Sequence, residues 1–166
     1  MDRDLINGLN QGRVPSAGAA APGIGLVPVK VTATTLSSSI DLAGFHGAVL
    51  ALMIGAFGDV QSGTVYMEGE LQESNDDSTY TAVADADLLF PPSDVARAGT
   101  ATGTFFQSKT TAAHDLSGIY TVGYRGNKRY LKVNLRLTGT HSTGTPVAVL
   151  MTAGFPDYAP VSGNAS

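Results

Sequence analysis

A two-residue alternation of apolar and polar side chains runs through RYLKVNLRLT at residues 129–138. Because successive side chains of a β-strand point to opposite faces, this pattern predicts a strand with one apolar and one polar face. The expected core face consists of Leu131, Val133, Leu135 and Leu137, and the expected solvent face of Tyr130, Lys132, Asn134, Arg136 and Thr138. Such a strand needs a second layer to cover its apolar face.

The same period of two recurs along most of the chain after residue 25. In TVYMEGELQES at residues 64–74, we expect Val65, Met67 and Leu71 to point inward and Tyr66, Glu68, Glu70 and Gln72 to point outward. Further strands are expected at residues 26–34, 37–45, 48–56, 80–90, 105–111, 119–126 and 145–154. Short strands separated by turn residues, without a long helix, predict an all-β fold, an antiparallel β-sandwich of jelly-roll-like type.

Turn residues predict how several strands are joined. SNDDST at residues 74–79 is expected to form a turn, and GTHSTGT at residues 139–145 a longer hairpin loop. In YRGNKRY at residues 124–130 we expect a tight hairpin turn, because Gly126 and Asn127 tolerate left-handed conformations. By contrast, the prolines and glycines of residues 91–104 predict little regular structure.

One β-sandwich domain is expected over residues 26–160, since a chain of 166 residues can bury one sizeable core. Residues 1–25 combine a weak helical pattern with the stretch RVPSAGAAAPGIG, which predicts a flexible, extended N-terminal arm. Residues 161–166 are expected to form a disordered tail. The arm and the tail thus flank a single folded unit.

Two of the expected strands, at residues 48–56 and 145–154, are apolar on both faces. A strand of this kind is expected to be covered on both sides. Together they carry more apolar strand surface than one isolated sandwich readily hides, which predicts a homo-oligomer.

Composition argues against several classes of partner and site. A formal net charge of -4 argues against nucleic-acid binding, which needs basic surfaces. Cysteine is absent, so no disulfide, thiolate nucleophile or Cys-based zinc site can form. The N-terminus lacks the features of a signal peptide, and the longest apolar run, at residues 48–57, is about half of a membrane span. We therefore expect neither nucleic acid nor membrane as a partner, and a protein that stays in the cytoplasm or leaves it by lysis.

The search for catalytic and metal-binding patterns gives only structural explanations. His46, His114 and His141 lack the short spacings of metal sites, and the acidic stretch around Asp76 and Asp77 is explained by Asx-turn hydrogen bonds without calcium. No G-x-S-x-G or dinucleotide-binding pattern occurs. We therefore expect no enzyme activity, no metal and no cofactor. A carbohydrate-binding sandwich remains an alternative, although Trp is absent and the Tyr and Phe residues are scattered.

Five cations gather in the expected turn and along the strand that follows it: Arg125, Lys128, Arg129, Lys132 and Arg136. Two interpretations are open. The cations form a solvated face that discourages edge-to-edge pairing of strands, or they dock on an acidic surface of a partner, where they would steer association and set its register.

Three stretches of the chain resemble a known family: LQESNDDSTYTAV, VGYRGNKRYLKV and PVAVLMTAGFPDYAP. They are similar to small structural proteins that tailed bacteriophages and prophages encode near their capsid genes, several of which look like head decoration, or cement, proteins. The likeness covers roughly residues 40–160 and is looser over residues 90–118.

This resemblance implies a virion protein that binds the outer surface of the major capsid shell, stabilises it across subunit seams, and resides in the host cytoplasm during assembly. It also implies self-association, with a homotrimer expected because icosahedral shells offer threefold positions. The arm would extend the contacts, so the candidate interaction residues are the five cations together with Asp2, Arg3, Leu5, Ile6, Leu9 and Arg13. The alternative in the same class is a head-spike base, tail or fibre subunit.

Overall fold

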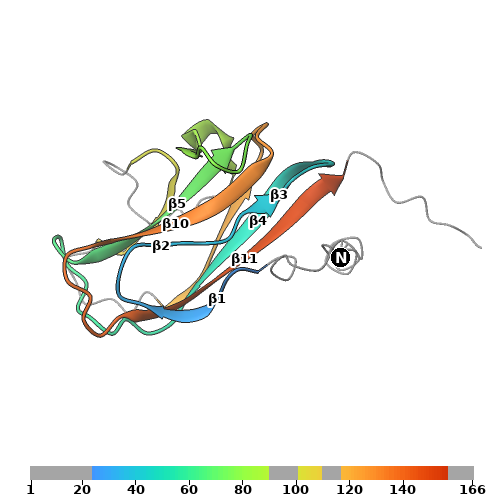
Figure 1. Cartoon of the computed structure of the whole chain (residues 1–166). Coiled ribbons are helices and arrows are strands. Elements are labelled where there is room, and N and C mark those ends of the chain that lie inside the picture. The colour runs from blue at the N-terminus through green and yellow to red at the C-terminus, as the bar shows by residue number, and fades with distance from the viewer. Residues whose placement is uncertain (1–23, 90–100, 110–116, 157–166) are drawn as a thin grey trace, which may run out of the picture.

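Two antiparallel β-sheets face each other across an apolar core in a computed structural model of the chain (Figure 1). The structure describes residues 24–89, 101–109 and 117–156. The prediction of an all-β antiparallel sandwich is confirmed. No helix within these three ranges has the length and apolarity that crossing a bilayer requires.

Sheet A contains five strands, in the order β1 (Ile24–Val31), β11 (Thr145–Pro156), β4 (Phe45–Ile54), β9 (Gly118–Tyr124) and β7 (Leu88–Leu89). Sheet B is built on β10 (Tyr130–Thr138) and β5 (Tyr66–Ser74), which pair along their whole length. Beyond β10 lie β2 (Thr35–Leu36) and β3 (Ile40–Asp41), and beyond β5 lie β6 (Thr81–Ala82) and β8 (Thr104–Gln107). Sheet B therefore ends in short strands on both sides, which limits edge-to-edge pairing.

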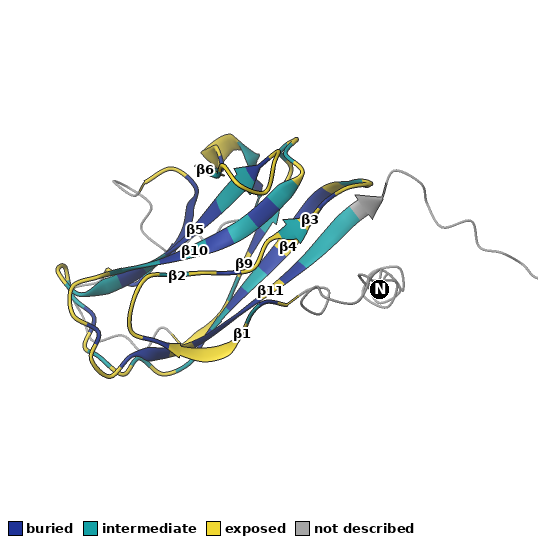
Figure 2. Ribbon diagram, viewed as in Figure 1, coloured by how far each residue is buried: buried dark blue, intermediate teal, exposed yellow. Residues whose placement is uncertain are grey.

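The core fills the space between the long central strands of the two sheets (Figure 2). Leu131, Val133 and Leu135 of β10 are fully buried, as the alternation of this strand predicts. They share the core with Leu50 and Leu52 of β4, which sheet A contributes. Burial of these side chains away from water is the main favourable term in folding.

The connections on either side of β10 differ from the predicted hairpins. β9 pairs with β4 and β7, whereas β10 pairs with β5, so residues 125–129 carry the chain from sheet A to sheet B. Residues 139–144 carry it back to sheet A. The prediction of left-handed conformations at Gly126 and Asn127 is also wrong, because neither residue has a positive φ. The reason is side-chain compatibility between the paired strands. The largely apolar β9 pairs with the apolar β4, and the basic side chains on the polar face of β10 lie beside the acidic side chains of β5.

The strand expected at residues 80–90 is broken into three pieces. After β6 the chain forms a short 3₁₀-helix, η1 (Asp85–Asp87), and then β7, which joins the opposite sheet. The carboxylate of Asp85 accepts a hydrogen bond from the backbone N–H of Gly103 at 3.1 Å, which fixes this crossing point. The single strand expected at residues 80–90 therefore corresponds to a segment that changes sheet.

Several sequence predictions lie outside the described residues. They include the C-terminal tail, His114, the N-terminal candidates Asp2, Arg3, Leu5, Ile6, Leu9 and Arg13, and the arm, except that Ile24 and Gly25 belong to β1.

The outer face of sheet B carries an ion-pair network centred on Arg136. Its guanidinium contacts Glu70 at 2.8 Å and Glu68 at 3.3 Å, across the β10–β5 register. Gln72 donates a further hydrogen bond to Glu70, and Gln107 donates one to Glu68. The side chain of Glu70, expected in solvent, is consequently only 7% exposed.

We predict that Arg136→Gln lowers the free energy of unfolding by about 2–3 kcal/mol, because it leaves the nearly buried carboxylate of Glu70 without its cation. The partial exposure of Arg136 keeps the loss below that of a fully buried pair. Lys132→Gln, on the same face of β10, is the matched control and should cost less than about 1 kcal/mol. Urea denaturation, followed by circular dichroism, measures the free energy of unfolding of both variants. Equal losses would contradict a stabilising role for the ion pairs of Arg136.

Candidate functional site

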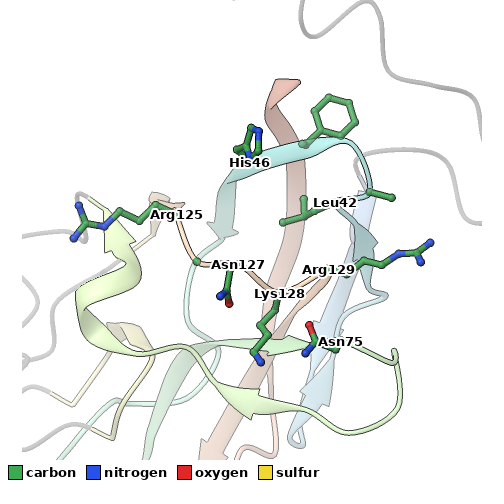
Figure 3. Close-up of a pocket in the computed structure, with 10 residues that line it drawn as sticks. Leu42, His46, Asn75, Arg125, Asn127, Lys128 and Arg129 are labelled. Carbon is green, nitrogen blue, oxygen red and sulfur yellow. The ribbon is translucent and has the colours of Figure 1, made fainter. Parts of the chain in front are cut away.

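A hollow of about 590 Å³ opens at one end of the sandwich (Figure 3). Three segments meet there: the β3–β4 loop, the β5–β6 turn and the β9–β10 connection. The residues that line it are Leu42, Ala43, Phe45, His46, Asn75, Arg125, Gly126, Asn127, Lys128 and Arg129. Three of the five predicted cations therefore lie around one hollow.

The buried side chain of Tyr124 holds the β9–β10 connection in place through hydrogen bonds of its hydroxyl group. Its buried ring points from sheet A into the core, and its hydroxyl donates to Glu73 of sheet B at 2.7 Å. The same hydroxyl accepts a hydrogen bond from the backbone N–H of Lys128 at 2.9 Å. A Cβ at position 126 would lie 2.4 Å from this oxygen, so glycine is required there by close approach. Burial, together with the hydrogen bond to Glu73, raises the pKa of Tyr124 well above its usual range.

Two of the cations at the hollow are used to fix the surrounding loops. Arg125 donates to the carbonyl of Ala86 through Nε and Nη2, at 3.1 and 2.8 Å. Arg129 forms a bidentate ion pair with Asp41, with both hydrogen bonds below 3 Å. The hydrogen bond from Arg129 holds the pKa of Asp41 below its usual value. In Figure 3 the two arginines extend away from each other, on opposite sides of the hollow.

Lys128 is the cation left available at this end. Its ammonium group has no ion-pair or aromatic partner among the described residues. It lies between the two arginines, together with the amide side chains of Asn75 and Asn127 (Figure 3). Leu42 and Phe45 add apolar lining. The hollow can therefore receive an anionic group, with Lys128 as the charge and the amides as hydrogen-bond donors.

The other two predicted cations lie apart from the hollow, along β10. Lys132 places its ammonium 3.5 Å from the ring centroid of Tyr80, a cation–π contact, and Arg136 is held by the ion pairs described above. Burial and the hydrogen bond to Asp77 raise the pKa of Tyr80 to about 12. The structure thus separates the five cations into one surface group and two side chains that stabilise sheet B.

The acidic stretch beside the hollow is a hydrogen-bonded turn, as predicted. The Oδ1 atom of Asp76 accepts hydrogen bonds from the backbone N–H groups of Thr79 and Ser78, at 2.8 and 2.9 Å, and from the hydroxyl of Ser74 at 2.8 Å. These donors, with Thr79 the strongest, hold the pKa of Asp76 far below its usual value. The turn joins β5 to β6 and places Asn75 at the hollow.

The two histidines in the described ranges lie in different parts of the fold. His141 is buried, and its Nε2 lies 3.0 Å from the carbonyl oxygen of Thr138. His46, the second residue of β4, lines the hollow. Within the described ranges, no three His, Asp or Glu side chains gather as metal ligands do.

Most of the residues that line the hollow could not be recognised as site residues from the sequence. Leu42, Phe45 and Asn75 come from segments far from the basic stretch, and neither their residue types nor their spacing mark a site. Only the cations are recognisable in advance, because they are close in sequence.

A search of protein-family models and of curated proteins finds no match to this chain.

We predict that Tyr124→Phe lowers the free energy of unfolding by about 1–3 kcal/mol, because the Lys128 N–H and the Glu73 carboxylate lose their shared partner. Tyr66→Phe is the matched control, since no described residue forms a hydrogen bond with that hydroxyl. Urea denaturation compares the two variants. An equal effect at both positions would show that the Tyr124 hydroxyl does not link the sheets.

Asp76 should make the stability of the protein depend on pH. Its folded pKa lies below the unfolded value of about 4, so its contribution is present above pH 4 and is lost as the pH falls toward the folded pKa. Asp76→Asn should therefore be less stable than the wild type at pH 7 and lose less stability on acidification. Asp87→Asn is the control. Unfolding curves recorded from pH 7 to about pH 2 give the pH dependence of the free energy of unfolding for each variant. Parallel pH profiles for wild type and Asp76→Asn would contradict this role.

Proposed function

We propose that the protein is a structural subunit of a tailed-phage virion that binds the outer surface of the capsid shell and stabilises it as a decoration protein. Its partners would be the major capsid protein and further copies of itself. Function then lies in surfaces, and specific interfaces of this kind bury about 1,600 Å² in total.

The observation that carries this proposal is where the phage-like stretches fall in the fold. LQESNDDSTYTAV forms the end of β5, the Asp76 turn and β6, while VGYRGNKRYLKV contains the β9–β10 connection and Tyr124, whose hydroxyl accepts a hydrogen bond from it. Both stretches meet at the hollow, and hydrogen bonds fix its rim. Two of the three phage-like stretches thus meet at one rigid surface end, while the third, PVAVLMTAGFPDYAP, includes most of β11 in sheet A.

A rigid end with one available cation among the described residues suits docking on an acidic surface. The loops there are already ordered by Tyr124, Arg125 and Arg129, so binding would cost little conformational entropy. Lys128 would act on the rate of association more than on affinity, as charges at the rim of an interface do. This narrows the docking interpretation of the basic cluster to one residue.

The proposal is tested by co-sedimentation of the purified full-length protein with capsids and, separately, with tails of the phage whose genome encodes it. We expect the protein to pellet with capsids. Pelleting with tails alone would favour the tail or fibre alternative, and pelleting with neither would contradict a virion role.

Lys128→Gln should slow association with capsids by about two- to fivefold at low salt, the equivalent of one exposed charge pair, and should make the rate less dependent on salt. Lys30→Gln is the matched control. Lys30 is an exposed residue of β1, and its substitution removes the same charge at a position away from the hollow. Stopped-flow or surface-based kinetics at two salt concentrations measure the rates. Identical rates for wild type and Lys128→Gln would remove Lys128 from the interface.

A further inference from the structure

The outer face of sheet A is an apolar surface built from three neighbouring strands. The register aligns its outward residues in rows: Val49 of β4 lies between Thr152 and Gly123, Ala51 between Leu150 and Thr121, and Met53 between Ala148 and Ile119. The alternate residues of the same strands, such as Leu50 and Leu52, point into the core. Sheet A therefore has a second apolar face, opposite the one that the core covers.

Much of this face is open to solvent. Val49 is 53% exposed, Ile119 68% and Leu150 38%. The strands β4, β9 and β11 contain no Asp, Glu, Lys or Arg. The outer face of sheet B, by contrast, carries Arg136 with its two glutamates. An exposed apolar face that excludes charge on one side of a sandwich marks an interaction surface.

The pattern of large and small side chains on this face fits a copy of itself. Val49 stands beside Gly123, and Leu150 stands beside Ala51, so ridges alternate with hollows from strand to strand. Sheets pack face to face when side chains of one interdigitate with those of the other. A face without charge offers no electrostatic basis for selecting a charged partner, whereas its own surface matches in polarity and in relief.

We propose that a second copy of this chain packs on the outer face of sheet A, the two identical faces meeting around a two-fold axis. Each residue of the contact is then used twice, as in isologous dimers. The resemblance to phage proteins suggested a trimer, but two identical faces that cover each other close as a pair. The pairing depends only on sheet A and is independent of capsid binding.

The size of the face predicts a reversible contact. β1 continues this face as a fourth strand, because its Ile24 pairs with Leu150 and is 39% exposed. Four strands spaced about 4.8 Å apart, over about seven residues of 3.3 Å, give a flat area near 450 Å² for each copy. Two copies would bury about 900–1,000 Å², which is the lower end of specific interfaces. The pair should therefore dissociate on dilution.

Sedimentation velocity of the full-length protein over a range of concentrations tests the pairing. We expect a monomer–dimer equilibrium in the wild type. Val49→Lys and Ile119→Lys should each raise the dissociation constant by at least about tenfold, because each places a charge in an apolar contact. Val60→Lys is the matched control, because Val60 is 77% exposed but lies in the loop between β4 and β5. The dimer dissociation constant of this variant should equal that of the wild type.

A second measurement does not depend on a charge in the sheet. The chain has no cysteine, so a single Thr121→Cys, at an exposed position of the face, can be treated with a short bismaleimide. We expect covalent dimers from Thr121→Cys and few from Val60→Cys. A monomer at all concentrations, a trimer, a dimer that tolerates both lysines, or Thr121→Cys that resists labelling in the monomer would each overturn the proposal.

Discussion

The apolar layer between the central strands of the two sheets determines what the rest of the molecule can do. Burial of Leu50 and Leu52 against Leu131, Val133 and Leu135 uses one face of each sheet. The two outer faces then differ according to the alternate residues of the same strands. In sheet B these residues are charged and satisfy one another, whereas in sheet A they are apolar and have no partner within the described chain.

The local pattern of the sequence predicts strands well, because the period of two depends only on neighbouring residues. It correctly assigned the inward residues of β10 and β5, and the hydrogen-bonded turn at Asp76. It failed on the connections around β10, since a turn rich in Gly and Asn looks the same whether it closes a hairpin or crosses between sheets. The pairing of β10 with β5, in which Arg136 contacts Glu68 and Glu70, decides between these two kinds of connection. A local sequence pattern contains no information about this register.

The candidate site was predictable only in part, for a related reason. Adjacent positions in sequence bring Arg125, Lys128 and Arg129 to one end, but their roles depend on distant partners. Asp41 and the Ala86 carbonyl occupy the two arginines, and Tyr124 fixes the backbone of Lys128. A count of charges in the sequence therefore overstates the basic character of the surface, because most of these charges hold the fold together.

The two proposed surfaces are compatible because they lie on different parts of the sandwich. The hollow is formed by loops at one end, whereas the apolar face is formed by the middle of β4, β9 and β11. A two-fold pair would leave both hollows open and fixed relative to each other. On a surface with repeated binding positions, two weak contacts in one rigid unit act together, and the second gains from a high effective concentration if the spacing matches. A single available lysine at each end could then suffice for docking, because the pair, rather than each copy alone, would determine how long the protein stays bound.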